Sequence, residues 1–263
     1  MENINQLMTD SEKDNFSKIS LESERKLLEE FTTVANEITP FTSNLIQEIG
    51  VTLQRNLSRG LTNIVQFLGY NKSKIRKITL DKEGKITLNI GTANISKDGL
   101  INADLFFSGG EVLNIIRGRK RWNIDLFINL GSYDKYLFEC ADGIVLSHVL
   151  EHIYPSLAIK ALGNCFNYLK PGGGIRISVP HLEAFNQGNF SSYLGIANRN
   201  LAKNYLIYGF HHKFMYDVEI LALLMKQAGF SEVQQVFYGK GLLNETDEPS
   251  HKIESIYLTA VKI

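Results

Sequence analysis

Apolar positions recur every three or four residues near the start of the chain, which is the spacing of an amphipathic helix. Two such sets, separated by Pro40, are Leu27, Phe31, Val34, Ala35 and Ile38, and then Leu45, Ile49, Leu53, Leu57 and Leu61. They predict two helices, arranged as a hairpin, that serve packing or self-association rather than catalysis. Residues 1–20 are polar and acidic, which favours disorder, and the short basic run 72-KSKIRK-77 predicts a solvated linker.

From about residue 78 the pattern alternates between strands and helices. Helix spacing covers 156–170, with Ser156 as N-cap and Pro171–Gly174 as the stop, and 218–229, with Asp217 as N-cap. Strand candidates are 85–91, 99–106, 122–130, 141–148, 175–180, 231–239 and 255–263. The alternation predicts an α/β fold with a mostly parallel, covered sheet, in which the last two strands form an antiparallel edge pair.

The predicted domain organisation follows from this change of pattern. Residues 1–77 form a disordered and helical extension, and 78–263 form one domain in which 184–216 is an insert.

Composition narrows the function. The chain has 263 residues, with Lys+Arg 28 and Asp+Glu 28, so a net charge of zero gives no electrostatic footprint for nucleic acid or a membrane surface. We expect its two cysteines, Cys140 and Cys165, to be buried thiols in a reducing compartment. No signal-peptide layout and no apolar run of about 20 residues is present, so we expect a cytoplasmic protein without membrane insertion.

The stretch 147-SHVLEHI-153 contains His148-x-x-Glu151-His152, a zinc-binding pattern of metallopeptidases. On one helix face two imidazoles would hold the metal and the carboxylate would act as base. The pattern follows an apolar strand, however, and Pro155 leaves room for roughly one helical turn. We therefore expect no metal site, with Glu151 and His152 as supports of a loop, and keep a zinc hydrolase as the third alternative.

Polar and glycine residues occupy the ends of several predicted strands. Gly91, Asp104, Asn129 and the pair Ser147–His148 each follow a strand. Ligands of open parallel sheets bind at the carboxyl ends of the strands, and a carboxylate there suits the hydroxyls of a ribose. Gly91 and Asp104 are closer in sequence than the roughly 20 residues typical of a dinucleotide fold, which argues against an NAD enzyme.

From about Ile86 the chain resembles the class I S-adenosylmethionine-dependent methyltransferases, especially a type-11-like bacterial group. The resemblance covers the nucleotide turn, the acidic segment, the loop after the fourth strand and the later motifs. These are 88-LNIGTA-93, 99-GLINAD-104, 147-SHVLEHI-153, 169-LKPGGGIRISVPHLE-183, 212-HKFMYD-217 and 223-LLMKQAGF-230.

The resemblance implies a Rossmann-like fold, a seven-stranded mostly parallel sheet with an antiparallel C-terminal strand, and S-adenosylmethionine as cofactor. The implied cofactor-binding residues are Asn89, Gly91, Thr92, Ala93, Asp104, Asn129, Leu130, Ser147 and His148. Two of them depart from the family pattern, since Ala93 replaces a glycine and Asn129 stands where Asp-Leu is common.

The implied reaction is methyl transfer to a small-molecule or saccharide acceptor, at oxygen or nitrogen. His148 and His181 are the candidate bases, because a neutral imidazole can accept a proton near pH 7. The insert should cover the acceptor, with Tyr208, His211 and His212 as substrate residues. The alternative is an inactive methyltransferase-like binding or assembly module, and in either case the N-terminal helices are candidates for homo-oligomer formation.

Overall fold

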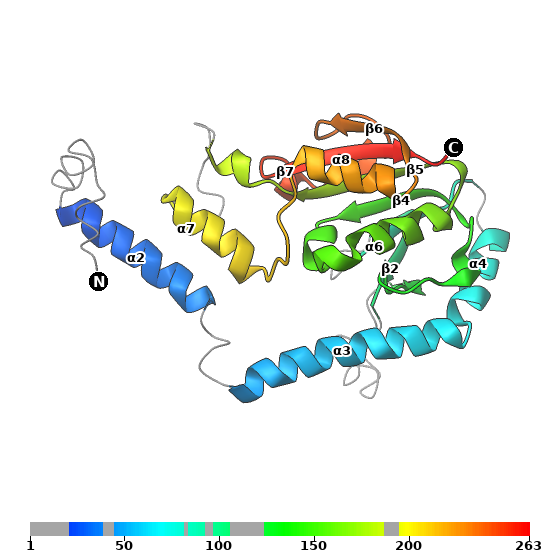
Figure 1. The fold of residues 1–263 in the computed structure, drawn as a ribbon, viewed down its shortest axis with the longest axis horizontal. Coiled ribbons are helices and arrows are strands. Elements are labelled where there is room, and N and C mark those ends of the chain that lie inside the picture. The colour runs from blue at the N-terminus through cyan, green and yellow to red at the C-terminus, as the bar shows by residue number, and fades with distance from the viewer. Residues whose placement is uncertain (1–20, 39–44, 82–83, 93–96, 106–123, 187–194) are drawn as a thin grey trace.

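A single twisted sheet organises the C-terminal two-thirds of the protein (Figure 1). The computed structural model describes residues 21–38, 45–81, 84–92, 97–105, 124–186 and 195–263, so the expected disorder of 1–20 lies outside it. Within these residues the seven strands are ordered β3-β2-β1-β4-β5-β7-β6. They span Thr87–Ile90 (β1), Ile101–Asp104 (β2), Leu126–Phe127 (β3), Ala141–Ser147 (β4), Leu169–Pro180 (β5), Ser231–Val236 (β6) and Ser255–Val261 (β7).

The central strands pair in parallel and are buried on both faces, as expected for a covered sheet. Leu88 of β1 is in register with Ile144 of β4, which in turn aligns with Ile175 of β5. All three side chains are fully buried. Strand β7 runs antiparallel to both β5 and β6, which confirms the predicted edge pair and the Rossmann-like, mostly parallel seven-stranded sheet.

Strand β5 begins earlier than the sequence indicated. The helix before it ends at Tyr168, but the following Pro-Gly-Gly run belongs to the strand rather than to a turn. The amide of Gly172 donates to Lys262 O at 2.7 Å, and the amide of Lys262 donates to Gly173 O at 2.9 Å. Pairing with the end of the chain therefore extends the strand, which local sequence could not indicate.

Helices α6 (Pro155–Tyr168) and α8 (Val218–Gln227) lie side by side against the sheet (Figure 1). Asp217 caps α8 as predicted, accepting a hydrogen bond from the amide of Ile220. The predicted cap at Ser156 is wrong, because Tyr154 is the N-cap of α6 and Pro155 occupies its first position. Proline is favoured there, since its missing N–H has no partner inside the helix.

Shorter elements connect these parts. They are the 3-10 helices η3 (Lys135–Leu137), η4 (Leu150–His152), η5 (Leu182–Asn186), η7 (Asn244–Thr246) and η8 (Pro249–His251), the helix α7 (Arg199–Asn204) and the π-helix η6 (Tyr205–Gly209).

The N-terminal segment contains α2 (Leu21–Ile38), α3 (Leu45–Phe67) and α4 (Tyr70–Asp81). The basic run 72–77 lies within α4, so the linker prediction is wrong. Asn71 holds this helix to the sheet edge, because its side chain exchanges hydrogen bonds with both the carbonyl (2.7 Å) and the amide (3.1 Å) of Phe127 in β3. Helix α2, blue in Figure 1, lies beside α7 of the insert, where Glu30 accepts hydrogen bonds from the amides of Ala197 and Asn198.

Helix α3 turns its polar face inward. Ser58, Thr62 and Gln66, spaced by four, are buried, whereas Leu53 and Leu57 of the predicted apolar stripe are 65% and 58% exposed. The two helices were predicted correctly, and the described apolar residues Leu53 and Leu57 of α3 face away from the rest of the chain. No helix in the described residues combines the length and apolar character needed to cross a membrane.

Candidate cofactor site

A pocket of about 560 Å³ opens at the carboxyl ends of β1 to β4. Helix α3 and the start of α6 form the rest of its wall. Its lining residues are Arg59, Asn63, Ile90, Gly91, Asp104, Leu105, Ile128, Asn129, Leu130, Gly131, Ser132, His148, Val149, His152, Ile153, Tyr154, Leu157 and Lys160. This is the position and size expected for a small-ligand site of a parallel sheet.

Gly91 makes the turn that ends β1. Its φ is +79°, and a Cβ at this position would lie 2.4 Å from Val149 Cγ2. Its amide donates to Ala103 O at 2.8 Å, so the turn is tied to β2. Only glycine satisfies both the backbone conformation and the close approach of the loop after β4.

Asp104 and Asn129 lie on the wall formed by β2 and β3. The Asp104 carboxylate accepts a hydrogen bond from the amide of Leu105 at 2.6 Å. The side chain of Asn129 accepts from the amide of Gly131 at 3.0 Å and donates to Asn63 of α3 at 2.9 Å. Leu130 also lines the pocket, so with Gly91 and His148 five of the residues implied by the resemblance converge there.

Three other implied residues do not line the pocket. Asn89 is buried and donates to Asn102 Oδ1 at 3.1 Å, Thr92 is buried beside β2, and Ser147 is hydrogen-bonded to Ser178 at 3.2 Å. They fix neighbouring strands rather than face the ligand space. Ala93 lies outside the described residues.

His148 lines the pocket in a left-handed backbone conformation, with φ of +53°. Its Nε2 lies 2.7 Å from Ser255 Oγ, and its ring stacks on that of His251 with centroids 3.7 Å apart. Burial, together with the charges of the neighbouring histidines, lowers the pKa of His148 to about 2. The ring therefore stays neutral at physiological pH but is a weak proton acceptor.

Glu151 lies behind His148 and is fully buried. Its Oε1 is 3.5 Å from His148 Nδ1 and 4.0 Å from His212 Nε2. Burial raises the pKa of the Glu151 carboxyl to about 8 and lowers the pKa of His212 to about 3. Both groups are thus driven towards their neutral forms by loss of solvent.

The remaining predicted residues lie away from the pocket. His181 follows β5, where its amide donates to Glu254 O at 2.7 Å, and it does not line the pocket. Tyr208 is 57% exposed on η6, and His211 follows it. The part of the insert that follows η6 contacts the loop after β4, because the amide of Lys213 donates to Glu151 O at 2.7 Å.

The residues of the His-x-x-Glu-His pattern are divided between two groups of possible metal ligands. Residues 150–152 form a single 3-10 turn, as the position of Pro155 indicated. Histidines 148 and 152 belong to different clusters, His148 with His251 and Glu254, and His152 with Glu151 and His212.

The residues that sequence reasoning missed include polar side chains of the pocket and two members of the clusters. Arg59 and Asn63 come from α3, Lys160 from α6, His251 from η8 and Glu254 from the segment before β7. The spacing of four between Arg59 and Asn63 places them on one helix face, which was an available signal. Nothing in the sequence around His251 indicates its contact with His148.

Comparisons with known proteins give distant structural likenesses. No protein-family model and no curated protein sequence matches the chain. An S-adenosylmethionine-dependent methyltransferase from Archaeoglobus fulgidus is similar over 76% of this chain and 94% of its own, with 18% identity and a TM-score of 0.44. Human N-acetylserotonin methyltransferase, solved with S-adenosylmethionine, matches over 91% of this chain and 67% of its own, with 15% identity and a TM-score of 0.46.

Phosphoethanolamine N-methyltransferase 2 of Haemonchus contortus matches over 69% of this chain, with 14% identity and a TM-score of 0.42. The match covers 49% of that enzyme, so the present chain spans about half its length. A function for this chain therefore has to be argued from its own pocket.

Proposed function

We propose that the protein is a methyltransferase that uses S-adenosylmethionine. The observation that carries the proposal is the convergence of Gly91, Asp104 and Asn129, from three consecutive strands, on one pocket at the carboxyl edge of the sheet. That edge is where nucleoside ligands of such sheets bind.

Each part of the cofactor has a chemically suited place in the pocket. The Asp104 carboxylate suits the two ribose hydroxyls, and the apolar side chains of Ile128 and Leu130 suit the adenine faces. The turn at Gly91 lets the backbone approach the methionine part. The cofactor supplies an activated sulfonium methyl, and the protein aligns the acceptor with it.

We propose a small-molecule or saccharide acceptor, methylated at oxygen or nitrogen. His148 is the histidine of the two candidate bases that lines the pocket. Its low basicity favours a role in orienting the acceptor through a hydrogen bond. The positive side chains Arg59 and Lys160 on the same wall favour an acceptor or cofactor group that carries negative charge.

Calorimetry with S-adenosylmethionine and its demethylated product tests the proposal directly. We expect binding by the full-length chain and a loss of roughly 10- to 100-fold in affinity for Asp104→Ala, because hydrogen bonds to a charged group contribute about 1.5–3 kcal/mol. Asp98→Ala is the matched control, since Asp98 is an exposed carboxylate in the preceding loop. An absence of heat for the parent protein at high micromolar cofactor would refute the proposal.

An inactive binding module is the second candidate, and one observation favours it. Of the two histidines expected to act as bases, His148 is a weak base and His181 lies outside the pocket. This alternative predicts cofactor binding without turnover. The two candidates are separated by measuring how much demethylated product forms with a panel of hydroxyl and amine acceptors. The slow background hydrolysis of the cofactor is subtracted.

We also propose self-association through α3. Leu53, Leu57, Ile64 and Phe67 are exposed on this helix at spacings of four, seven and three, which place them on one face, while the opposite face packs against the same chain. A second copy of α3 would cover this stripe, as in a coiled coil. Light scattering should show a dimer for the parent protein and a monomer for Leu57→Glu. A monomeric parent would contradict the proposal.

The cytoplasm is the proposed location. Cys140 and Cys165 are both free, and burial raises the pKa of each thiol to about 12. Free thiols favour a reducing compartment.

A further inference from the structure

Four of the six histidines gather with two buried glutamates beside the pocket. They divide into two groups, each with three possible metal-ligand atoms within 4.8 Å of one another. One group is His148, His251 and Glu254, and the other is Glu151, His152 and His212. The orientation of the rings distinguishes the two groups.

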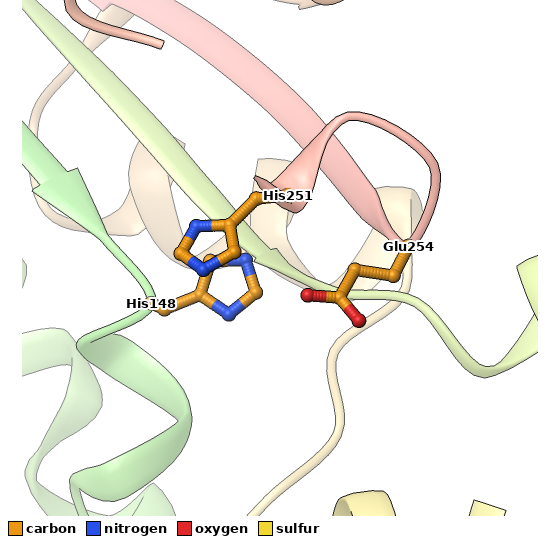
Figure 2. A group of neighbouring side chains, drawn as sticks. All are labelled: His148, His251 and Glu254. Carbon is orange, nitrogen blue, oxygen red and sulfur yellow. The ribbon is translucent and has the colours of Figure 1, made fainter. Parts of the chain in front are cut away.

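The first group has the wrong geometry for an ion. Figure 2 shows the rings of His148 and His251 lying over one another, with centroids 3.7 Å apart and planes inclined by 28°. An imidazole binds a metal through a lone pair in the ring plane, so stacked rings cannot both point at an ion between them. In addition, His148 Nε2 is within hydrogen-bond distance of Ser255 Oγ.

The second group has the geometry that the first lacks. The rings of His152 and His212 are not stacked: their planes are inclined by 67°, with centroids 4.8 Å apart, and one ring nitrogen of each lies within 4.8 Å of a Glu151 oxygen and of the other. Glu151 lies in the same group and none of its surface is exposed. Neither of its carboxylate oxygens makes a hydrogen bond with another described residue, and the same holds for His212 Nδ1.

A fully buried carboxylate without hydrogen bonds is costly unless it is protonated or neutralised by a cation. Two imidazoles lie within 4.0 Å of this carboxylate, with His148 Nδ1 at 3.5 Å and His212 Nε2 at 4.0 Å, and a neutral imidazole is a metal ligand. Two histidines and one carboxylate form a common ligand set for zinc and related ions. The set differs from the one suggested by the sequence pattern, because His212 replaces His148.

We propose that Glu151, His152 and His212 bind a divalent transition-metal ion such as Zn²⁺. Ligand atoms at about 2.1 Å from a tetrahedral zinc lie roughly 3.4 Å apart, so binding would draw this group together by about an ångström. His152 is exposed at the end of η4, which leaves its side chain room for that movement.

The ion would also have access to the pocket. His152 is a lining residue, so a fourth coordination position could face the ligand space and take an oxygen of the acceptor. This last step rests on the proposed methyltransferase function, whereas the metal site does not.

The test uses the full-length protein after treatment with a chelator and buffer exchange. Zn²⁺ is titrated by calorimetry, and Co²⁺ is titrated while its visible absorption is recorded. We expect one equivalent to bind, with an absorption band of a low-coordinate cobalt site. His152→Ala and His212→Gln should each weaken binding by at least roughly 10- to 100-fold, the loss that even outer-shell partners cause.

His251→Gln is the matched control, because His251 belongs to the stacked group, and it should leave the affinity unchanged. His152 is exposed, so His152→Ala should unfold at the parent temperature, and this is checked by thermal melting. Absence of saturable binding below 100 µM, taken as roughly the upper limit for a functional site, would overturn the proposal. Unchanged binding by His152→Ala, or a loss with His251→Gln instead, would do the same.

Binding of the demethylated cofactor is measured on the same samples. Metal binding without cofactor binding would keep the metal site and refute the methyltransferase. Cofactor binding without metal binding would refute the metal site and leave the proposed methyltransferase standing.

Discussion

The side-chain amide of Asn129, in the loop after β3, donates a hydrogen bond at 2.9 Å to Asn63 of α3, 66 residues earlier. This bond joins the N-terminal helical segment to the wall of the pocket. Arg59, one turn before Asn63, lines the same pocket. Helix α3 is therefore part of the candidate site and more than an appendage for self-association.

Asn63→Ala should weaken cofactor binding, because the loop that carries Asn129 loses its contact with α3. One hydrogen bond contributes about 0.5–1.5 kcal/mol, so we expect a loss of roughly 2- to 10-fold in affinity by calorimetry. Asn200→Ala, at an exposed asparagine of α7, is the control and should bind as the parent does. Equal affinities of all three proteins would show that α3 does not support the site.

Gly91→Ala should abolish cofactor binding and destabilise the protein. Gly99→Ala is a matched control, because the φ values of the two glycines are +79° and +78°. A Cβ on Gly99 meets no atom within 4 Å, whereas one on Gly91 would lie 2.4 Å from Val149 Cγ2. Both variants should lose about 1–2 kcal/mol of stability from the backbone conformation, and Gly91→Ala about 1–3 kcal/mol more from overpacking.

Urea denaturation measures that difference, and calorimetry measures binding. Similar behaviour of the two alanine variants would mean that the approach of Val149 to Gly91 is not needed.

Arg176 should be a main contributor to the stability of the β6–β7 region. It is buried in β5, where its guanidinium forms paired hydrogen bonds of 2.5 and 2.6 Å with Asp247 and donates to the carbonyls of Lys240 and Leu242. Arg176→Ala leaves the Asp247 charge uncompensated and should reduce the free energy of unfolding by about 3–5 kcal/mol.

Arg199→Ala is the control for this prediction, because Arg199 is exposed on α7. It should change the free energy of unfolding by less than about 0.5 kcal/mol. A small effect of Arg176→Ala in the urea curve would contradict the assigned role.

Asp142 should make the stability of the sheet depend on pH in the acid range. Burial alone would raise the pKa of its carboxyl, but hydrogen bonds from the Ile86 amide and Lys170 outweigh burial and lower the pKa from its ordinary value. Because the folded-state pKa is below the unfolded one, this stabilisation is complete above about pH 4 and is lost as pH falls through the folded-state pKa.

Asp142→Asn removes this contribution, so its stability should fall less steeply than that of the parent between about pH 4 and pH 2. Urea curves at several pH values test this. Parallel pH profiles for the two proteins would exclude Asp142 as a source of the dependence.

Several features could be predicted because they depend on local sequence. The apolar residues from Leu27 to Ile38 recur with helical spacing, and they lie in helix α2. Asp217 precedes an apolar helix, and its side chain caps α8. Gly91 and Asp104 at strand ends predicted where a pocket should lie, because the carboxyl ends of parallel strands share one edge.

Features that depend on distant partners could not be predicted. The basic run 72–77 forms a helix because Asn71 and Ile75 are buried against the sheet, and β5 begins at Leu169 because the end of the chain pairs with it. In α3 the polar residues Ser58 and Thr62 face inward, contrary to the hydrophobic pattern, because that face packs against its own chain.

The sequence by itself thus determined the α/β alternation, the order of the strands along the chain and the edge at which a ligand would bind. Only the tertiary structure decided that α3 closes the pocket and that His148 and His152 separate into different clusters. The physical reason is distance along the chain: spacing fixes which side chains share a face of one element, but His212 and His251 reach the loop after β4 only when the insert and the last strands have packed.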